Sequence, residues 1–507
     1  MKRLALSLAA IAIAGSSAWA QYTTTVPDLK AQVDKAKASI TKSDAEINDA
    51  KKTALVKTWE NRAKTFVTAY EINTKGVQAG YQAAPSETNP FACLQTSNGE
   101  PKEKKTEQIG NETYEVWVYP TINYYIKNNT VQFWKETYVA DEKALDKATE
   151  AYKKAIELDD NTGKGTYKSK KTTIDAIASL HDLYFNDGVN QYQLKNNKKA
   201  AEDFEGALKA VTLVENCKPD SIIGQTAYYA GLTAYENGNK DKAEQSFKQS
   251  IDKKYQIGGS YHYLYQINMD KGQKQKAIEL AKSAYEKYPN EEQILYDVIN
   301  YYLSNQQNEE AEKYLDQAIQ KYPQNKGLHT VKANMYVTAY RESQKKFEEE
   351  KHKADSLKKA AFRNRSNKTE NDRLTAEQEK MNQKAEETRK EFFSGCKKAE
   401  DIYNKLISED PKYYDAYFML GMVYYDKSEL AGKEKDMIPL SEDKDGSKAA
   451  AKEKEQKEAW RMSLNYFQKA SEIQPTNKDA LSNMRILYSK LGEYQKAKEI
   501  KERIEKL

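Results

Sequence analysis

Residues 224–257, GQTAYYAGLTAYENGNKDKAEQSFKQSIDKKYQI, carry a pattern that decides the fold. The pattern recurs at 258–291, GGSYHYLYQINMDKGQKQKAIELAKSAYEKYPNE, and again at 292–325, EQILYDVINYYLSNQQNEEAEKYLDQAIQKYPQN. Matching positions lie 34 residues apart and hold Gly231, Tyr265 and Ile299, then Ala243, Ala277 and Ala311, then Ser250, Ala284 and Ala318. A fixed period of this length predicts a stack of similar structural units.

Small residues on one helix face explain why the units stack. Ala277, Ala281 and Ala284 are spaced four and three apart, so they share one face of a helix. Side chains this small let a neighbouring helix approach closely, and Leu264 and Tyr265 of the preceding helix supply the bulk that fills the contact. One helical pair cannot bury this surface alone, but a stack of pairs can.

Two of the three copies end on a proline, Pro289 and Pro323, and proline stops a helix. A small or bulky residue at position 8, Ala at 20, a large apolar residue at 24, Ala at 27 and Pro at 32 resemble the tetratricopeptide repeat (TPR). The resemblance extends over most of residues 56–507. It implies an all-α superhelical solenoid of about eight helix-turn-helix repeats.

The chain begins like an exported protein. Lys2 and Arg3 precede an apolar run that is too short to span a bilayer, and small residues follow it. We expect residues 1–20 to be a signal peptide whose cleavage involves Ala18, Ala20 and Gln21. Since Gln21 is not a cysteine, the sequence offers no lipoprotein anchor, and we expect a soluble mature protein without a transmembrane segment.

After the signal peptide, we predict six segments. In chain order, they are a lead-in helix at 21–55; a first TPR hairpin at 56–161 with a β-like insertion at about 72–140; TPR repeats at 162–325; a TPR repeat at 326–413 with a long helical insertion at about 341–395; a TPR repeat at 414–477 with a charged insertion at about 427–458; and a C-terminal TPR hairpin at 478–507.

The first insertion is rich in aromatic and β-branched residues on both sides of Lys127-Asn128-Asn129, which predicts a β-hairpin or small sheet. Pro120 would confine its strand to an edge. Two interpretations of Trp117 and Trp134 stay open. They could form a platform that binds a sugar or peptide, or they could pack together and cover the end of the solenoid.

The second insertion predicts an antiparallel helical arm. Residues 341–390 contain 15 Lys/Arg and 11 Asp/Glu but no Gly or Pro, so both helices of this repeat should continue past the usual turn. The turn is expected in the segment RNRSNKTENDR at 363–373, where Asn and Ser gather. Such an arm resembles a coiled coil and would project from the solenoid.

No residue pattern in the sequence indicates catalysis, a cofactor or a metal. The four histidines are not paired with each other or with cysteine at ligand spacing, and no phosphate-binding loop, nucleophile elbow or HExxH motif occurs. Charged residues make up 31% of the chain with both signs mixed, which argues against nucleic acid. Cys93, Cys217 and Cys396 allow at most one disulfide, and their redox state stays open.

The resemblance implies a binding groove formed by the first helix of each repeat. The candidate groove residues are Tyr228, Leu232, Tyr235, His262, Gln266, Met269, Tyr296, Asn300 and Leu303. None is Lys or Arg, whereas family members that hold acidic tails use basic residues there. Tyrosine with Asn and Gln suits an apolar or neutral polar segment of a protein partner.

These features predict an exported scaffold or adaptor, and not an enzyme, that mediates protein–protein interactions through its concave groove and helical arm. We expect it in the periplasm or outer envelope of a Gram-negative bacterium, because its Tyr, Lys and Asn usage resembles exported TPR proteins of the Bacteroidetes. The alternative is a glycan-binding component of an envelope nutrient-uptake system. The partner and the oligomeric state stay open.

Overall fold

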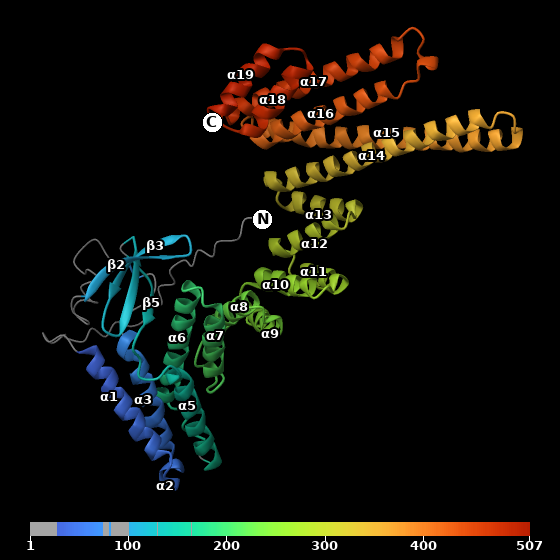
Figure 1. Cartoon of the computed structure of the whole chain (residues 1–507). Coiled ribbons are helices and arrows are strands. Elements are labelled where there is room, and N and C mark those ends of the chain that lie inside the picture. Colours follow the sequence, from blue (N-terminus) through green and yellow to red (C-terminus); the bar gives the residue numbers. More distant parts are fainter. Residues whose placement is uncertain (1–27, 75–80, 83–100, 129, 164) are drawn as a thin grey trace. The chain divides into compact units, whose positions relative to one another are not determined.

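A computed structural model describes residues 28–74, 81–82, 101–128, 130–163 and 165–507. The chain divides into two compact units, Met1–Ile294 and Leu295–Leu507, and each is described by itself. The fold is all-α and built of TPR-like helical hairpins, with one small antiparallel sheet inserted near the N-terminus (Figure 1). This confirms the predicted fold class.

The helices of the first unit follow each other as antiparallel pairs. Their bounds are α1 (Leu29–Glu46), α2 (Ala50–Thr53), α3 (Val56–Thr74), α5 (Ala144–Asn161), α6 (Lys171–Gln193), α7 (Asn197–Val211), α8 (Asp220–Glu236), α9 (Lys240–Asp252), α10 (Ile257–Asp270) and α11 (Lys274–Lys287), and α12 (Glu292–Ser304) begins at its end. The packed pairs are α3 with α5, α6 with α7, α8 with α9, and α10 with α11.

A glycine on the first helix of a pair faces a phenylalanine on the second, and this contact sets how closely the two helices approach. A Cβ atom added to the glycine would lie only 2.8–2.9 Å from the ring, too close for any side chain. The contact occurs twice in the first unit and once in the second, as Gly188 with Phe204, Gly231 with Phe247, and Gly421 with Phe467. The three phenylalanines are almost completely buried.

The alanine face predicted in α11 is confirmed. Ala277, Ala281 and Ala284 are all buried, and so are Leu264 and Tyr265 of α10, which were predicted to fill the contact. Helices α9 and α10 also pack directly on each other. The stack therefore continues from one pair to the next through small residues that face large ones.

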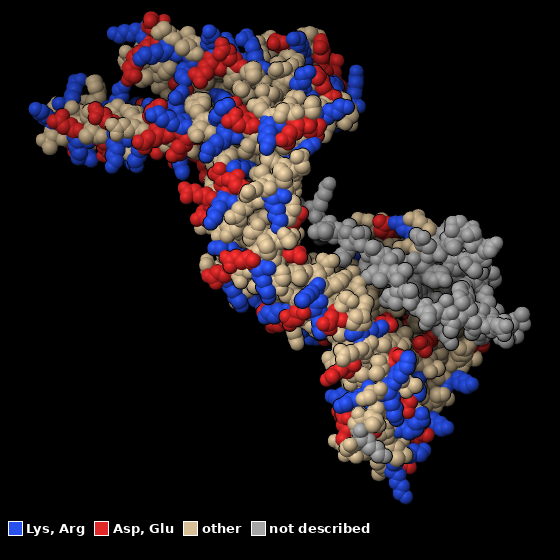
Figure 2. All heavy atoms as spheres, turned by 180° about the vertical axis from the view of Figure 1, so that it is seen from behind, with Lys and Arg blue, Asp and Glu red and all other residues tan. Residues whose placement is uncertain are grey.

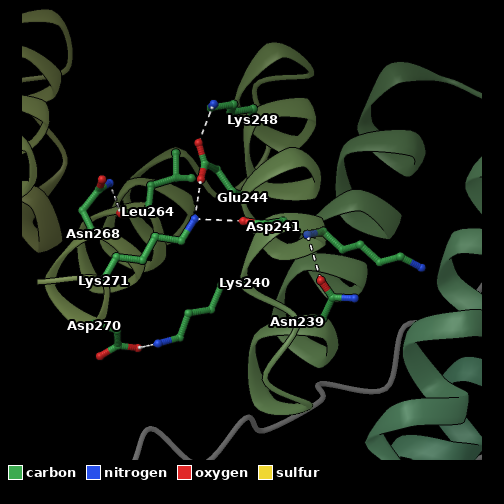
Figure 3. Close-up of polar contacts among 10 residues, drawn as sticks. Asn239, Lys240, Asp241, Glu244, Lys248, Leu264, Asn268, Asp270 and Lys271 are labelled. Carbon is green, nitrogen blue, oxygen red and sulfur yellow. Dashed lines mark hydrogen bonds and ion pairs between the residues drawn. The ribbon is translucent and has the colours of Figure 1, made fainter. Parts of the chain in front are cut away.

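Polar contacts join α9 to the end of α10 (Figure 3). Lys271, which follows α10, reaches Asp241 at 2.9 Å and Glu244 at 3.3 Å, and Lys240 lies 3.2 Å from Asp270. The Asp241 side chain is 91% exposed and the other four are 27–39% exposed, so each ion pair contributes little free energy.

The inserted sheet contains strands β1 (Tyr81–Gln82), β2 (Glu103–Ile109), β3 (Glu112–Val118), β4 (Ile122–Lys127) and β5 (Thr130–Glu136) in the order β1-β5-β4-β3-β2. All neighbours are antiparallel. The predicted hairpin around Lys127-Asn128-Asn129 is the β4–β5 hairpin. The edge-strand prediction for Pro120 is wrong, because Pro120 lies in the turn between β3 and β4, where proline removes no ladder hydrogen bond.

The second unit begins within α12 and continues with α13 (Asn308–Lys321), α14 (Lys326–Arg363), α15 (Lys368–Glu409), α16 (Tyr414–Asp436), the short 3-10 helix η1 (Leu440–Glu442), α17 (Ser447–Ile473), α18 (Lys478–Lys490) and α19 (Tyr494–Glu505). The long arm is confirmed: α14 and α15 run side by side and turn at 364–367, within the predicted segment (Figure 1).

The arm is not a free projection, because α16 extends along part of it. Lys433 of α16 pairs with Glu348 of α14, and Arg389 of α15 pairs with Glu434 of α16. Arg341 of α14 donates to Asp426 of α16 at 2.7 Å. In the view of Figure 2, basic and acidic side chains alternate over these hairpins, as expected for a surface held by mixed ion pairs.

The glycine–phenylalanine contact gives a stability prediction. Replacing Gly231 with Ala should lower the free energy of unfolding by about 1–3 kcal/mol, because the new methyl group meets the Phe247 ring at 2.8 Å. Helix propensity alone would favour Ala by about 1 kcal/mol. Urea denaturation followed by circular dichroism measures the difference.

The matched control is the same substitution in a Phe247→Leu background. There the ring is gone, so Gly231→Ala should be neutral or stabilising, and the two changes should be strongly non-additive. If Gly231→Ala destabilises both backgrounds equally, the clash with Phe247 is not the cause.

Candidate functional site

The predicted groove residues of the first unit lie on two neighbouring helices, α8 and α10. Tyr228, Tyr235, His262, Gln266 and Met269 are all partly exposed. The rings interlock, because Tyr263 of α10 packs 5.3 Å from Tyr235 and 6.5 Å from Tyr228, measured between ring centroids. We call these five residues the α8–α10 face.

Hydrogen bonds hold the side chains of the α8–α10 face in place. The Tyr235 hydroxyl donates to Asp270 at 3.0 Å, and the His262 ring lies 3.2 Å from the Gln293 amide. The Tyr228 ring is half-buried between Phe247 and Tyr255. Burial raises the pKa of Tyr228. Burial and the hydrogen bond to Asp270 raise the pKa of Tyr235 to about 12, so both hydroxyls stay protonated at neutral pH. The face therefore offers ordered rings and hydroxyl groups to a partner.

Leu232 was predicted to line the groove, and this is wrong. It is only 2% exposed and packs with Phe247 and Leu264 in the core between α8, α9 and α10. Its position in the repeat faces the next pair of helices. Leu232 is thus a packing residue, not a contact residue.

The remaining groove candidates belong to α12 and fall in the second unit. Tyr296 is partly exposed, and its hydroxyl accepts a hydrogen bond from Asn325 at 3.3 Å. Asn300 is exposed and Leu303 is partly exposed. All three are accessible within their own unit, and their role in binding stays a prediction.

The described aromatic side chains of β3, β4 and β5 do not form an exposed platform. Trp117, Tyr124 and Trp134 are buried in one cluster, and Tyr125 and Phe133 are buried on the other face of the sheet. The packing interpretation is therefore the correct one for these rings. The glycan-binding alternative loses the exposed aromatic surface on which it was based.

The remaining sequence predictions concern the signal cleavage site, the cysteines, metal ligands and membrane spans. Ala18, Ala20 and Gln21 lie outside the described residues, as does Cys93. Cys217 and Cys396 are free thiols, and burial raises the pKa of Cys396. The described residues contain no cluster of three or more potential metal ligands, and none of their helices has the length and apolarity to cross a membrane.

A cavity that the sequence did not reveal lies where the inserted sheet meets α3, α6 and α7. Its volume is about 480 Å³. The lining residues are Ala69, Tyr70, Trp134, Lys135, Glu136, Val139, Asp141, Glu142, Asp187, Asn190, Gln191, Leu194, Asn196 and Lys199. We call it the β5–α6 cavity.

Two asparagines position the wall of the β5–α6 cavity. The Asn190 side chain accepts from the Trp134 backbone N–H at 2.8 Å and donates to the Trp134 carbonyl at 3.1 Å, so it pairs with β5 beyond the short contact of β5 with β1. Asn73 of α3 donates to Glu136 at 2.9 Å and to the Tyr138 carbonyl at 3.0 Å. These bonds satisfy strand groups that would otherwise be buried without partners.

The acidic groups around this cavity are difficult to ionise. Burial, reinforced by Asp187, raises the pKa of Glu136 to about 7. Burial also raises the pKa of Asp187, and burial together with Asp187 raises that of Asp203 to about 8. Lys199 opposes this by pairing with Asp203 at 2.5 Å. Perturbed carboxyl groups next to a cavity are a feature of functional sites.

The only sequence signal for the buried acids Asp187 and Asp203 is their place in the repeat pattern. Asp187 directly precedes Gly188 and Asp203 directly precedes Phe204, which are the packing positions of the pair α6/α7. An acidic residue beside a packing position normally reaches solvent. Here the inserted sheet covers it, and that cover depends on tertiary contacts.

Comparison with known proteins supports the repeat. Residues 268–335 match the tetratricopeptide-repeat family. This match runs from the end of α10 through α11, α12 and α13 into the first part of α14. The tetratricopeptide-repeat fold is that of a scaffold for protein–protein interactions.

Solved structures with similar folds are distant. A TPR protein from Bacteroides fragilis is 14% identical, covers 61% of this chain and 98% of its own length, and has a TM-score of 0.25. The C-terminal part of a TPR protein from Cytophaga hutchinsonii is 15% identical, covers 68% and 99%, and has a TM-score of 0.34. Likenesses this distant carry no argument about function. A search of curated proteins finds no match.

Glu136 gives a prediction about the pH dependence of stability. Its pKa is about 7 when folded and near 4.5 when exposed, so its contribution is fully present below pH 4.5 and is lost as the pH rises through 7. Glu136→Gln removes this loss while keeping an oxygen for Asn73. The variant should gain up to about 3 kcal/mol over the wild type between pH 5 and pH 8. Urea denaturation at both pH values measures it.

Glu142→Gln is the control, because Glu142 also lines the cavity but is exposed. Its effect should be small and independent of pH. Equal pH dependence in the Glu136→Gln variant and the wild type would show that Glu136 titrates as an exposed carboxyl group.

Proposed function

We propose that this protein is an exported adaptor of the bacterial cell envelope that binds a neutral, partly apolar segment of a protein partner through the first helices of its repeats. The observation that carries the proposal is the α8–α10 face. It presents two tyrosines, a histidine, an amide and a methionine, all partly exposed, and none of the five is Lys or Arg. Tyrosine supplies a large contact area and a hydroxyl at low entropic cost.

The chemistry of the α8–α10 face favours one class of partner over others. An acidic tail would need Lys or Arg at these positions, and Lys240, which follows α8, pairs with Asp270 at 3.2 Å. The Tyr235 hydroxyl shares the same Asp270. The local charge is thus already balanced, which suits a segment that brings little charge of its own.

Residues 1–21 support export. A Lys-Arg pair, an apolar run and the ending Ala18-Trp19-Ala20 form the pattern of a secretory signal. The α14/α15 arm adds a second contact surface at some distance from the α8–α10 face along the chain. An adaptor with two such surfaces can hold two proteins at once.

The binding prediction uses a triple variant, Tyr235→Ala, Gln266→Ala and Met269→Ala. These side chains are partly exposed on first helices, so helicity should be retained while recovery of partners from native envelope extracts falls at least about fivefold. Quantitative mass spectrometry after affinity capture measures the recovery.

The matched control changes three exposed residues on second helices, Gln245→Ala, Lys248→Ala and Lys276→Ala. This variant should capture the same partners as the wild type. If the triple variant of the α8–α10 face also keeps them all, binding does not occur on that face.

Export makes a separate prediction. The protein purified from its native host should begin at Gln21, because cleavage is expected after Ala20. N-terminal sequencing by mass spectrometry measures this directly. A mature chain that retains residues 1–20 would contradict export through this signal, and an Ala18→Asp variant should accumulate uncleaved as the positive control.

A further inference from the structure

We propose that the end of the α14/α15 arm docks onto the anionic surface of a lipid bilayer. The docking surface consists of residues 359–368, which we call the arm tip, and it belongs to the second unit. An exposed phenylalanine enters the headgroup region while the cations around it pair with lipid phosphates. The proposal goes beyond the adaptor function and does not use the α8–α10 face, so either can fail without the other.

The arm tip gathers positive charge without a balancing acid. Residues 359–368, KAAFRNRSNK, contain 4 Lys/Arg and no Asp/Glu. The cations on either side are already paired, Lys358 with Glu442 and Arg373 with Glu370. The four basic side chains of the tip are exposed and make no ion pair within the described part of the chain: Lys359, Arg363, Arg365 and Lys368. Their charge is therefore available to a partner.

Phe362 places a large apolar ring among these cations. It is 68% exposed, whereas every other phenylalanine that the structure describes is buried or partly buried. The Arg365 guanidinium lies 5.0 Å from the centroid of the Phe362 ring, so a cation stands directly beside the exposed ring. An aromatic ring flanked by cations suits the interface of an anionic membrane, where rings lie at headgroup level and basic residues meet phosphates.

The stability of the arm does not account for this composition. Lys359 and Arg363 lie near the C-terminal end of α14, where the helix dipole favours a cation. Lys368, however, is the first residue of α15, where the same dipole disfavours a cation. The exposed ring of Phe362 also buries little apolar surface within the protein. A partner outside the protein explains both residues.

The shape of the arm tip fits a flat surface. Lys358 of α14 pairs with Glu442 in η1, which connects α16 to α17, and Figure 1 shows the turn between α14 and α15 extending past that connection. The turn is held by its own hydrogen bonds, since the Asn367 side chain accepts from the Glu370 backbone N–H at 3.2 Å. A protruding, ordered tip can meet a bilayer, whereas a single nucleic-acid strand is usually bound along a groove.

Co-sedimentation of the full chain with lipid vesicles tests the docking. Vesicles of phosphatidylcholine and phosphatidylglycerol in about a 7:3 ratio should bind the wild type at least about tenfold more tightly than vesicles of phosphatidylcholine alone. Binding should weaken in about 1 M salt, where the Debye length falls to about 3 Å. Equal binding to both kinds of vesicle, or no binding to the anionic ones, would overturn the proposal.

Two sets of variants separate the contributions of charge and ring. The quadruple variant Lys359→Gln, Arg363→Gln, Arg365→Gln, Lys368→Gln should bind the anionic vesicles at least about tenfold more weakly. Phe362→Ala should weaken binding about threefold or more, and Phe362→Trp should retain it, because Trp suits the headgroup region. Wild-type affinity in Phe362→Ala, or tighter binding of a single-stranded oligonucleotide than of the vesicles, would contradict membrane docking.

The matched control removes the same number of charges from the body of the arm. It changes four exposed lysines that make no ion pair within the described residues: Lys345→Gln, Lys346→Gln, Lys380→Gln and Lys384→Gln. This variant should bind the anionic vesicles within about twofold of the wild type. A loss as large as that of the tip variant would show that binding follows net charge and not the arm tip. Circular dichroism should be the same for both variants, since all eight positions are exposed.

Discussion

The contact between a glycine and a phenylalanine ring, seen within three of the described helical pairs, is the constraint on which this structure depends. Where Gly231 faces Phe247, no Cβ atom fits, so the two helices approach as closely as their backbones and the ring allow. The same geometry recurs for Gly188 with Phe204 and for Gly421 with Phe467. Because this contact lies within one pair of helices, such a pair can form locally and then stack on its neighbours.

Because a pair of helices is held by contacts within the pair, the chain tolerates large insertions. The sheet is inserted between α3 and α5, and the extensions of α14, α15, α16 and α17 lie beyond the usual turns of their pairs. None of them interrupts the contacts within a pair. The extensions instead support each other, since ion pairs such as Lys433 with Glu348 connect α16 to the arm. An arm held in this way can act as a rigid contact surface.

The β5–α6 cavity arises where an insertion meets a regular repeat. Asn190 on α6 pairs with β5, and this places Glu136 and Asp187 beside each other under partial cover. The inserted sheet covers a helix surface that would otherwise be solvated, and burial raises the pKa of Glu136, Asp187 and Asp203 there. The α8–α10 face, by contrast, remains an ordinary first-helix surface of ordered rings. The two places therefore differ in chemistry, with buried carboxyl groups of raised pKa in one and ordered rings with hydroxyl groups at the other.

The sequence by itself determined the repeat, its period, the alanine face of α11, the turn of the arm and the β4–β5 hairpin, because these depend on residues close together in the chain. It placed Leu232 on the surface and left Trp117 and Trp134 undecided, because their exposure depends on which element covers them. Only the tertiary structure decided these points and brought Glu136, Asp187 and Asp203 together. The physical reason is that helix periodicity states which residues share a face, whereas burial and pKa depend on what packs against that face.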